Sequence, residues 1–301
     1  MPSASASDGS EASTHNKETM LRLRVASALV LIPILVGAAW LGDPWASILV
    51  GLFAAAAAYE FMTLAERAGY QPMKRTGIAL ALVFLVAASV QANFLQNTGR
   101  ELIPIALTGA VVAALTVRLF RKEATTAFAD WGVTLGGALW TGWLLAHWVL
   151  LRDLEPDGRS WVIVALLLTF TSDTAAYAVG RSIGRHRLVP RISPNKTWEG
   201  AFGSLVATPV VAAALMALLA SAPAAAIGLA APISPLAALG IGLAVSVAAQ
   251  VGDLVESAVK RAAHVKDAGG LIPGHGGVLD RIDSLTFVAV VVYYLGPLLT
   301  S

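Results

Sequence analysis

Long apolar segments dominate this chain and decide which solvent it can fold in. A helix needs about 20 mainly apolar residues to cross the core of a bilayer. Only 13% of the 301 residues are charged, against about 25% in soluble proteins. The sequence therefore predicts an all-α integral membrane protein with about nine transmembrane helices. The nine segments are residues 25–41, 45–65, 77–95, 102–119, 131–151, 161–179, 201–220, 235–259 and 285–299.

Basic residues are distributed unevenly between the two ends of these segments. If the N-terminus is cytoplasmic, 18 of the 21 lysines and arginines fall on the cytoplasmic side, and only Arg100, Arg152 and Arg159 fall on the other. Loops that stay in the cytoplasm carry such an excess of positive charge. We therefore expect a cytoplasmic N-terminus, with the two long polar loops, residues 180–200 and 261–284, on the cytoplasmic side.

The chain divides into a short tail and one large unit. Residues 1–20 are rich in Ser and Ala and lack apolar periodicity, which predicts a disordered cytoplasmic tail. Residues 21–301 are expected to form a single polytopic membrane domain. The stretch 222–234 is apolar but contains Pro223 and Pro232, so it is either an outer loop or an extension of the seventh span. The absence of cysteine excludes disulfides, thiolate metal sites and a cysteine nucleophile.

Two carboxylates lie late in apolar spans. Asp173 lies late in the sixth span, and Asp253 occupies the matching place in the eighth. A charge near the bilayer centre costs about 2.5–3.5 kcal/mol, so an acid there is a functional candidate unless it pairs with a neighbouring cation. Helical spacing places Asp253, Ser257 and Lys260 on one face. The alternative is a salt-bridged helix end, with Glu256 and Lys260 paired at i, i+4.

A second pair of acids, Asp280 and Asp283, comes immediately before the last apolar span. Their spacing of three residues lets both point to one side of the first helical turn. Paired carboxylates suit Mg²⁺, which completes its octahedron with water and substrate phosphates. Capping is the competing interpretation, because acids in a first turn also complement the helix dipole.

The stretch between these acids, residues 265–284, combines five glycines with clustered charge. Glycines permit close backbone approach and let successive N–H groups surround an anion. Positive charge beside them comes from Lys260, Arg261, Lys266 and Arg281. This segment is therefore predicted to hold a polyphosphate and a divalent cation at the membrane surface. In the other loop, the run SPNKTWEG (193–200) offers hydroxyls and Lys196 to an anionic lipid headgroup, although cytoplasmic loops are basic in any case.

The run from Ser257 to Asp283 resembles the signature of the phosphatidate cytidylyltransferase family, also called CDP-diacylglycerol synthases. The resemblance extends to Asp173 with the following loop, to GDLVES around Asp253, and more loosely to residues 21–34, so it covers most of the chain beyond the tail. Asn195 departs from it, since many relatives have lysine or glycine there. The matching residues of the run are Ser257, Lys260, Arg261, Lys266, Asp267, Pro273, His275, Gly276, Gly277, Asp280, Arg281 and Asp283.

The resemblance implies a reaction in which CTP and phosphatidic acid give CDP-diacylglycerol and pyrophosphate, with the lipid phosphate attacking the α-phosphorus of CTP. Relatives suggest a homodimer, and no nucleic-acid partner is expected. The abundance of alanine and the preference for arginine over lysine indicate a bacterial protein, so we expect it in the plasma membrane as a multi-pass protein. Residue roles follow from the same resemblance. One or two Mg²⁺ ions would be bound by Asp173, Asp253, Asp280 and Asp283; the catalytic cations would be Lys260 and Arg261; substrates would be bound by Ser193, Lys196, Ser257, Lys266, Asp267, His275, Gly276, Gly277 and Arg281.

Two other functions were weighed against this one. A transporter or channel would also bury carboxylates, but it does not require a polyphosphate loop confined to one face. A CDP-alcohol phosphotransferase is another metal-dependent membrane enzyme of lipid synthesis. Its pattern places two aspartates four apart, whereas Asp280 and Asp283 are three apart.

The predicted orientation can be tested by labelling single cysteines in this cysteine-free chain. Because Ser182 lies in a basic loop and Asp157 in the loop across the sixth span, Ser182→Cys should react with a membrane-impermeant thiol reagent only from the cytoplasmic side. Asp157→Cys should react only from the opposite side. Reaction of both variants from the same side would contradict the nine-span arrangement.

Overall fold

The helices of the bundle coincide with the predicted apolar spans. The computed structural model describes residue 29 and residues 33–95, 101–120, 126–272 and 276–299. Within them, eight helical segments are long and apolar enough to cross a membrane. They match the second to the ninth predicted spans. Residues 33–41 of the first predicted span are helical, and its remainder, apart from residue 29, lies outside the described residues, as does the predicted tail.

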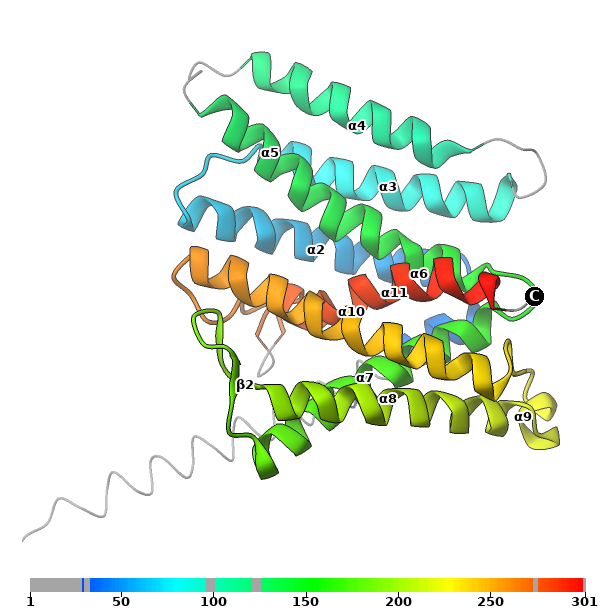
Figure 1. The fold of residues 1–301 in the computed structure, drawn as a ribbon. Helices are drawn as coiled ribbons and strands as arrows, with labels where there is room; N and C mark the ends of the chain where they lie inside the picture. The colour runs from blue at the N-terminus through cyan, green and yellow to red at the C-terminus, as the bar shows by residue number, and fades with distance from the viewer. Residues whose placement is uncertain (1–28, 30–32, 96–100, 121–125, 273–275, 300–301) are drawn as a thin grey trace, which may run out of the picture.

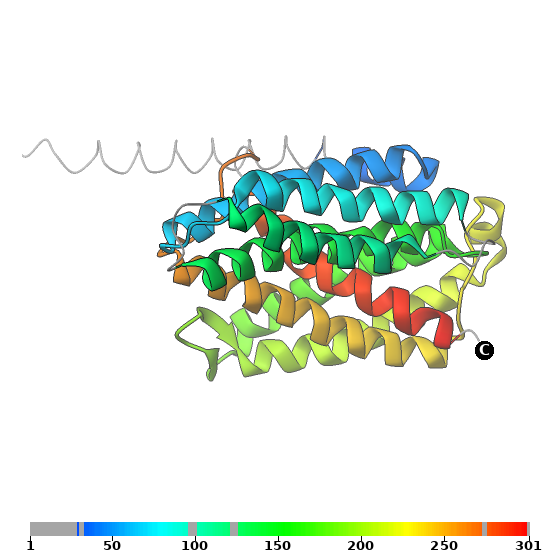
Figure 2. The ribbon, with the colours of Figure 1, turned by 90° about the horizontal axis from the view of Figure 1, so that it is seen from above.

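Two groups of helices pack side by side, as Figures 1 and 2 show. The first group consists of α2 (Trp45–Arg67), α3 (Lys74–Phe94), α4 (Leu102–Leu119), α5 (Ala127–Ala138), the π-helix η1 (Leu139–Leu144) and α6 (Leu145–Arg152). The second consists of α7 (Gly158–Ile183), α8 (Trp198–Leu219), α10 (Pro235–Ala262) and α11 (Leu279–Leu298). Helix α11 contacts α7 and α10 and also α2, α6 and η1, so it joins the two groups.

The fifth predicted span is one uninterrupted helical segment, in which a π-helix lies between two α-helices. A π-helix has i→i+5 hydrogen bonds and shifts the faces that the following helix presents. In η1, Gly142 lies so close to the backbone of Ala81 in α3 that a Cβ there would collide with it. Trp140 Nε1 donates a 3.1 Å hydrogen bond to Thr286 Oγ1 of α11. The π-helix therefore fixes this span between α3 and α11.

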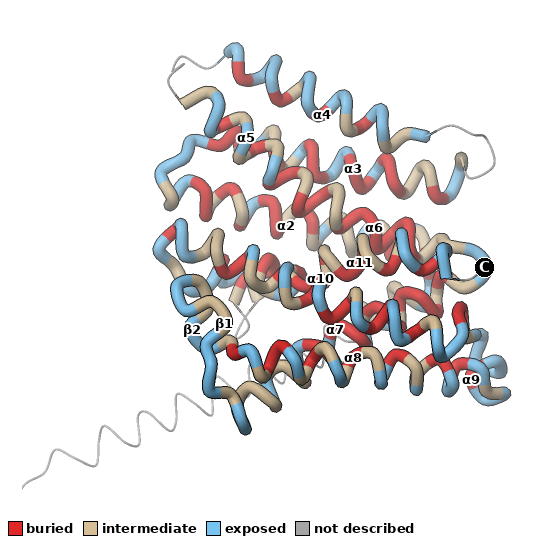
Figure 3. The backbone as a smooth tube through the Cα atoms, in the orientation of Figure 1, coloured by how far each residue is buried: buried red, intermediate tan, exposed pale blue. Residues whose placement is uncertain are grey.

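Buried hydroxyls connect the helices of the second group. Ser172 of α7, Ser204 of α8 and Ser246 of α10 form a chain of hydrogen bonds of 2.8 and 2.7 Å. Each hydroxyl satisfies the others where no water is available, which offsets the cost of burying them. Figure 3 shows buried residues, in red, running along the facing sides of these helices, while their outer sides are largely exposed.

The segment after α8 is neither a simple loop nor a continuation of that helix. Helix α8 ends at Leu219, and the short helix α9 (Ala222–Ala226) follows it. Three apolar side chains of the segment, Ala224, Leu229 and Ile233, are buried against the bundle. Pro223 stands in the first turn of α9, where its missing N–H costs nothing.

A short β-hairpin departs from the all-α fold that the sequence predicted. The loop between α7 and α8 contains a two-stranded antiparallel hairpin of β1 (Arg187–Val189) and β2 (Ser193–Thr197). Strands of three and five residues are too short to show the alternation that identifies a strand in a sequence. In Figure 1 the hairpin lies at the same end of the bundle as the segment that follows α10. The two polar loops therefore meet at one end.

Candidate functional site

A polar cavity of about 540 Å³ lies between α7, β2, α8 and α10. Four residues predicted from the sequence line it: Asp173, Ser193, Lys196 and Asp253. The hairpin supplies the serine and the lysine, and the two helices supply the acids. Further polar side chains around the cavity come from Arg181, Arg187, Asn195, Thr197 and Gln250. The fold thus brings the first polar loop and the acids of α7 and α10 to one cavity with cations and carboxylates in its lining.

An ion pair joins the hairpin to α10 at this cavity. Lys196 Nζ lies 2.7 Å from Asp253 Oδ2. Ser257 Oγ donates to the other oxygen of Asp253 at 3.3 Å, as expected for residues four apart on a helix. The two charged side chains remain 23% and 36% exposed, so the pair is accessible to a ligand. Asp253 can therefore exchange its lysine for another cation.

Asp283 of α11 completes a group of three like charges. It interacts electrostatically with both Asp253 and Asp173, and Asp173 interacts in turn with Asp253 and Lys196. Three carboxylates from three helices repel one another, and a shared cation relieves that repulsion. Their arrangement favours the binding of a positively charged ligand.

Lys260, near the end of α10, lies between two acids. It precedes the glycine-rich segment, residues 265–284. Its Nζ is 2.5 Å from Glu256 Oε2 and 2.6 Å from Asp280 Oδ1. The side chains of Lys260, Glu256 and Asp280 are 13%, 1% and 9% exposed. Because the group is almost fully removed from water, each charge depends on the others for compensation. The predicted i, i+4 pair of Glu256 and Lys260 is confirmed, with Asp280 as a third member.

Asp280 also organises the backbone of the glycine-rich segment. Its Oδ2 accepts the N–H groups of Ala268, at 2.9 Å, and Gly277, at 2.8 Å. Both of its carboxylate oxygens therefore have partners within the protein. Asp283 differs, because its Oδ1 accepts the N–H of the adjacent Ser284, at 2.7 Å. Of the two acids, Asp280 binds backbone amides of the glycine-rich segment, and Asp283 interacts electrostatically with the carboxylates of α7 and α10.

Arg261 holds the two polar loops together. Its Nε donates to the carbonyl of Ile192 in the hairpin at 3.1 Å, and its Nη1 donates to the carbonyl of Val265 at 3.0 Å. The guanidinium thereby links the hairpin turn to the end of α10. This geometry gives Arg261 a scaffolding role beside the catalytic one suggested by the sequence.

The other predicted residues are distributed along the same segment. Lys266, Asp267 and Arg281 are exposed. Gly276 has a φ of +81°, a conformation that glycine adopts without strain, and its carbonyl accepts the N–H of Ile272 at 3.0 Å. Gly277 is buried. His275 and Pro273 lie outside the described residues.

Three acids were given no site role by the sequence analysis: Glu60, Glu199 and Glu256. Glu199 accepts the backbone N–H groups of Arg185 and His186, and its Oε1 lies 2.6 Å from His186 Nδ1, which fixes the start of the hairpin. Glu60 of α2 is buried and contacts the start of α11. In the sequence it is a lone acid within the apolar run AAAAAYEF. A lone acid in an apolar run was the sequence signal that could have identified Glu60 as a candidate.

The carboxylates of this region fit a divalent cation that keeps water or phosphate among its ligands. Among the residues that the structure describes, no three Asp, Glu or His side chains are placed to hold a metal ion by themselves. Mg²⁺ commonly takes only one or two protein carboxylates, with water and phosphate as its other ligands. Asp173 and Asp253 meet that requirement as hard oxygen donors in the lining of the cavity, and Asp283 interacts electrostatically with both. Asp280 fits less well, because Lys260 and two amides occupy its oxygens.

Fold and site together define a class: a multi-pass membrane protein with a cavity lined by cations and carboxylates at one end of its helices. The particular family follows from the sequence, since residues 22–299 match the cytidylyltransferase family. The chain belongs to that family.

Three bacterial relatives carry the name phosphatidate cytidylyltransferase. The protein of Pseudomonas aeruginosa is 34% identical over 89% of this chain and 93% of its own length. That of Bacillus subtilis is 34% identical over 72% of this chain and 77% of its own. That of Mycobacterium leprae is 30% identical over 94% of this chain and 76% of its own. The family resemblance expected from the sequence is confirmed.

The buried position of Lys260 predicts a large loss of stability when its charge is removed. Lys260→Met leaves Glu256 and Asp280 without a cation, and breaking a buried pair costs about 3–5 kcal/mol. Glu256→Gln in addition should recover part of that loss. The control is Lys74→Met, which breaks an exposed pair with Glu66 (side chains 27% and 47% exposed) worth at most about 1 kcal/mol. Thermal unfolding in detergent measures all three; equal midpoints for Lys260→Met and Lys74→Met would contradict the prediction.

Proposed function

We propose that this protein is a phosphatidate cytidylyltransferase, which joins CTP to phosphatidic acid and releases pyrophosphate. The observation that carries the proposal is the polar cavity beside the hairpin, which is lined by Lys196, Asp173 and Asp253. Family membership and the names of the relatives support the same reaction. The rival CDP-alcohol phosphotransferase has no such support.

The chemistry needs no covalent protein nucleophile. An oxygen of the lipid phosphate is already anionic, and it attacks the α-phosphorus of CTP. The new P–O bond forms as the bond to the β-phosphate oxygen breaks, so pyrophosphate leaves. Catalysis in such transfers comes mainly from positioning and from neutralising the charge that builds on the phosphoryl oxygens. The side chains available for this are cations.

Lys196, Arg181 and Arg187 line the polar cavity, and we assign them to the anionic phosphates. Ser193 donates from the same hairpin. Lys260 is held at a defined place by Glu256 and Asp280, so it presents a fixed positive charge at the edge of the glycine-rich segment. Preorganised charge of this kind needs little rearrangement during the reaction.

Magnesium is the cofactor that this donor set would take. Asp253 and Asp283 would hold it, with Asp173 beside them, and the bound ion would neutralise phosphate charge and polarise the α-phosphorus. Asp280 would support catalysis indirectly, because it holds Lys260 and the backbone of the glycine-rich segment in place. Its bonds to Ala268 and Gly277 already give it that role.

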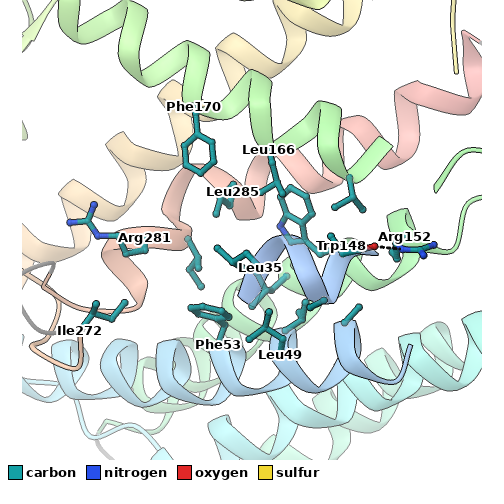
Figure 4. A pocket seen from close by; sticks show the side chains of 17 residues that line it. Leu35, Leu49, Phe53, Trp148, Arg152, Leu166, Phe170, Ile272, Arg281 and Leu285 are labelled. Carbon is teal, nitrogen blue, oxygen red and sulfur yellow. Dashed lines mark hydrogen bonds between the residues drawn. The ribbon is translucent and has the colours of Figure 1, made fainter. Parts of the chain in front are cut away.

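An apolar cavity on the other side of α11 offers a place for the lipid's hydrocarbon. It has a volume of about 290 Å³ and lies between residues 35–39, α2, α6, α7 and α11. Figure 4 shows Arg281 and Ile272 at one end of it and Arg152 at the other, with Leu166 and Phe170 along one wall. Arg281, Ile282 and Leu285 of α11 face this cavity, whereas Asp283 faces the carboxylates of α7 and α10. One helix thus separates a hydrocarbon site from a phosphate site.

Orientation completes the proposal. Both polar loops lie at one end of the bundle, and they carry eight of the 21 lysines and arginines, as cytoplasmic loops do. We place the site on the cytoplasmic face of a bacterial plasma membrane. CTP then reaches the site from the cytoplasm, and the lipid reaches it from the bilayer.

The reaction is tested with purified protein, CTP and phosphatidic acid. Pyrophosphate and CDP-diacylglycerol should form only when both substrates and Mg²⁺ are present. Asp283→Asn keeps the side-chain shape but removes a charge from the carboxylate group, so turnover should fall at least about a hundredfold, or about 2.7 kcal/mol. Glu155→Gln, the same change at an exposed position between α6 and α7, should have no effect. Pyrophosphate release without phosphatidic acid would contradict the reaction, and full activity in a chelator would contradict the metal.

The hydrocarbon site is tested by filling it. Leu166→Trp adds bulk inside the apolar cavity, whereas Leu167→Trp adds the same bulk on the exposed side of α7, where Leu167 is 44% exposed. We expect Leu166→Trp to lower kcat/KM for long-chain phosphatidic acid at least about tenfold, and for a dihexanoyl analogue much less. Leu167→Trp should leave both values near wild type. An equal loss for both lipids would show that the cavity does not hold the chain.

A further inference from the structure

Helix α11 starts against a carboxylate that belongs to a distant helix. Glu60 of α2 is only 2% exposed, and its Oε2 accepts the backbone N–H of Leu279, the first residue of α11, at 2.8 Å. The amide of Val278 also interacts with this carboxylate. Val278, the N-cap residue, makes no side-chain cap bond of its own. The first turn of α11 is therefore capped from 219 residues away.

The same carboxylate fills the space beside two glycines of the glycine-rich segment. A Cβ on Gly277 would lie 2.6 Å from Glu60 Oε2 and 2.7 Å from the nitrogen of Gly269. A Cβ on Gly269 would collide with Glu60 Oε1. Side chains at either position would thus displace Glu60. Both glycines are needed for close packing on this acid, independently of any ligand.

Glu60 and Asp280 hold the segment from opposite sides. Asp280 accepts the N–H of Gly277, which contacts Glu60, and the N–H of Ala268, which precedes the other glycine that contacts Glu60, Gly269. A buried carboxylate is costly unless it accepts strong hydrogen bonds, and amides at a helix N-terminus provide them. The geometry therefore lets α2 set where α11 begins, and with it the positions of Asp280 and Lys260.

We propose that Glu60 is a positioning residue for the transfer reaction, because it fixes the glycine-rich segment and the first turn of α11 from α2. This inference rests on the proposed function only for its kinetic readout. Glu60 contacts neither substrate in this account. It acts through the backbone of residues 277–279 and through Asp280.

The proposed role of Glu60 depends on its acceptance of the Leu279 N–H and not on its charge. Three variants of Glu60 therefore distinguish the two properties. Glu60→Gln can still accept the Leu279 N–H, and its new NH₂ group replaces Oε1, which has no hydrogen-bond partner among the described residues. Glu60→Asp keeps the charge but withdraws the acceptor by one methylene. Glu60→Ala removes it. The control is Glu66→Ala, an exposed acid on the same helix.

We expect kcat for CDP-diacylglycerol formation to fall at least about tenfold in Glu60→Asp and Glu60→Ala, and to stay within about threefold of wild type in Glu60→Gln and Glu66→Ala. Hydrogen–deuterium exchange supplies a readout that needs no activity. Exchange at the Leu279 amide should accelerate at least about tenfold in Glu60→Asp and Glu60→Ala only. If Glu60→Ala does not fold, the contrast between Asp and Gln still decides.

Two outcomes would overturn the role of Glu60: Glu60→Asp matching Glu60→Gln in kcat, or unchanged exchange at Leu279 in Glu60→Asp and Glu60→Ala. A wild-type protein that forms no CDP-diacylglycerol would instead contradict the proposed function. In that case the exchange data would still report whether Glu60 holds the start of α11.

Discussion

Lys260 is the cation on which the polar end of this bundle depends. It lies within 2.6 Å of both Glu256 and Asp280 in a place nearly free of water. Charges removed from water are costly unless they compensate one another, so this group can exist only as a set. Asp280 in turn holds the amides of Ala268 and Gly277. One buried ion network therefore determines the course of the glycine-rich segment.

Helix α11 carries that network into the rest of the membrane domain. Glu60 holds its first turn, Trp140 bonds to Thr286, and the hydroxyl of Ser284 donates to the carbonyl of Ala249 in α10 at 3.1 Å. These contacts come from three different elements of both helix groups. A helix anchored on several sides has one register, and a site built on it keeps its geometry without a ligand.

The two faces of α11 would let one protein hold both the anionic phosphates and the hydrocarbon chains that the proposed reaction brings together. Asp283 turns toward the carboxylates of α7 and α10, and Ile282 and Leu285 turn toward the apolar cavity. Residues three and four apart on a helix share a face, whereas adjacent residues are separated by about 100° and can contact different surroundings. The proposed transfer would take place where these two environments come closest, near the first turn of the helix.

The sequence by itself determined the membrane class, eight of the helical spans that the structure describes, and the family, because apolar length and a dense run of charged and glycine residues are local properties of a chain. It also indicated that Glu256 pairs with Lys260, since that spacing follows from one helix. It could not show that Glu60 caps α11, that Arg261 ties the hairpin to α10, or that Asp280 and Asp283 have different hydrogen-bond partners. Those contacts join residues far apart in the chain. Only tertiary packing decides which amide or cation each carboxylate reaches, because hydrogen bonds act over about 3 Å and sequence spacing says nothing about that distance between separate elements.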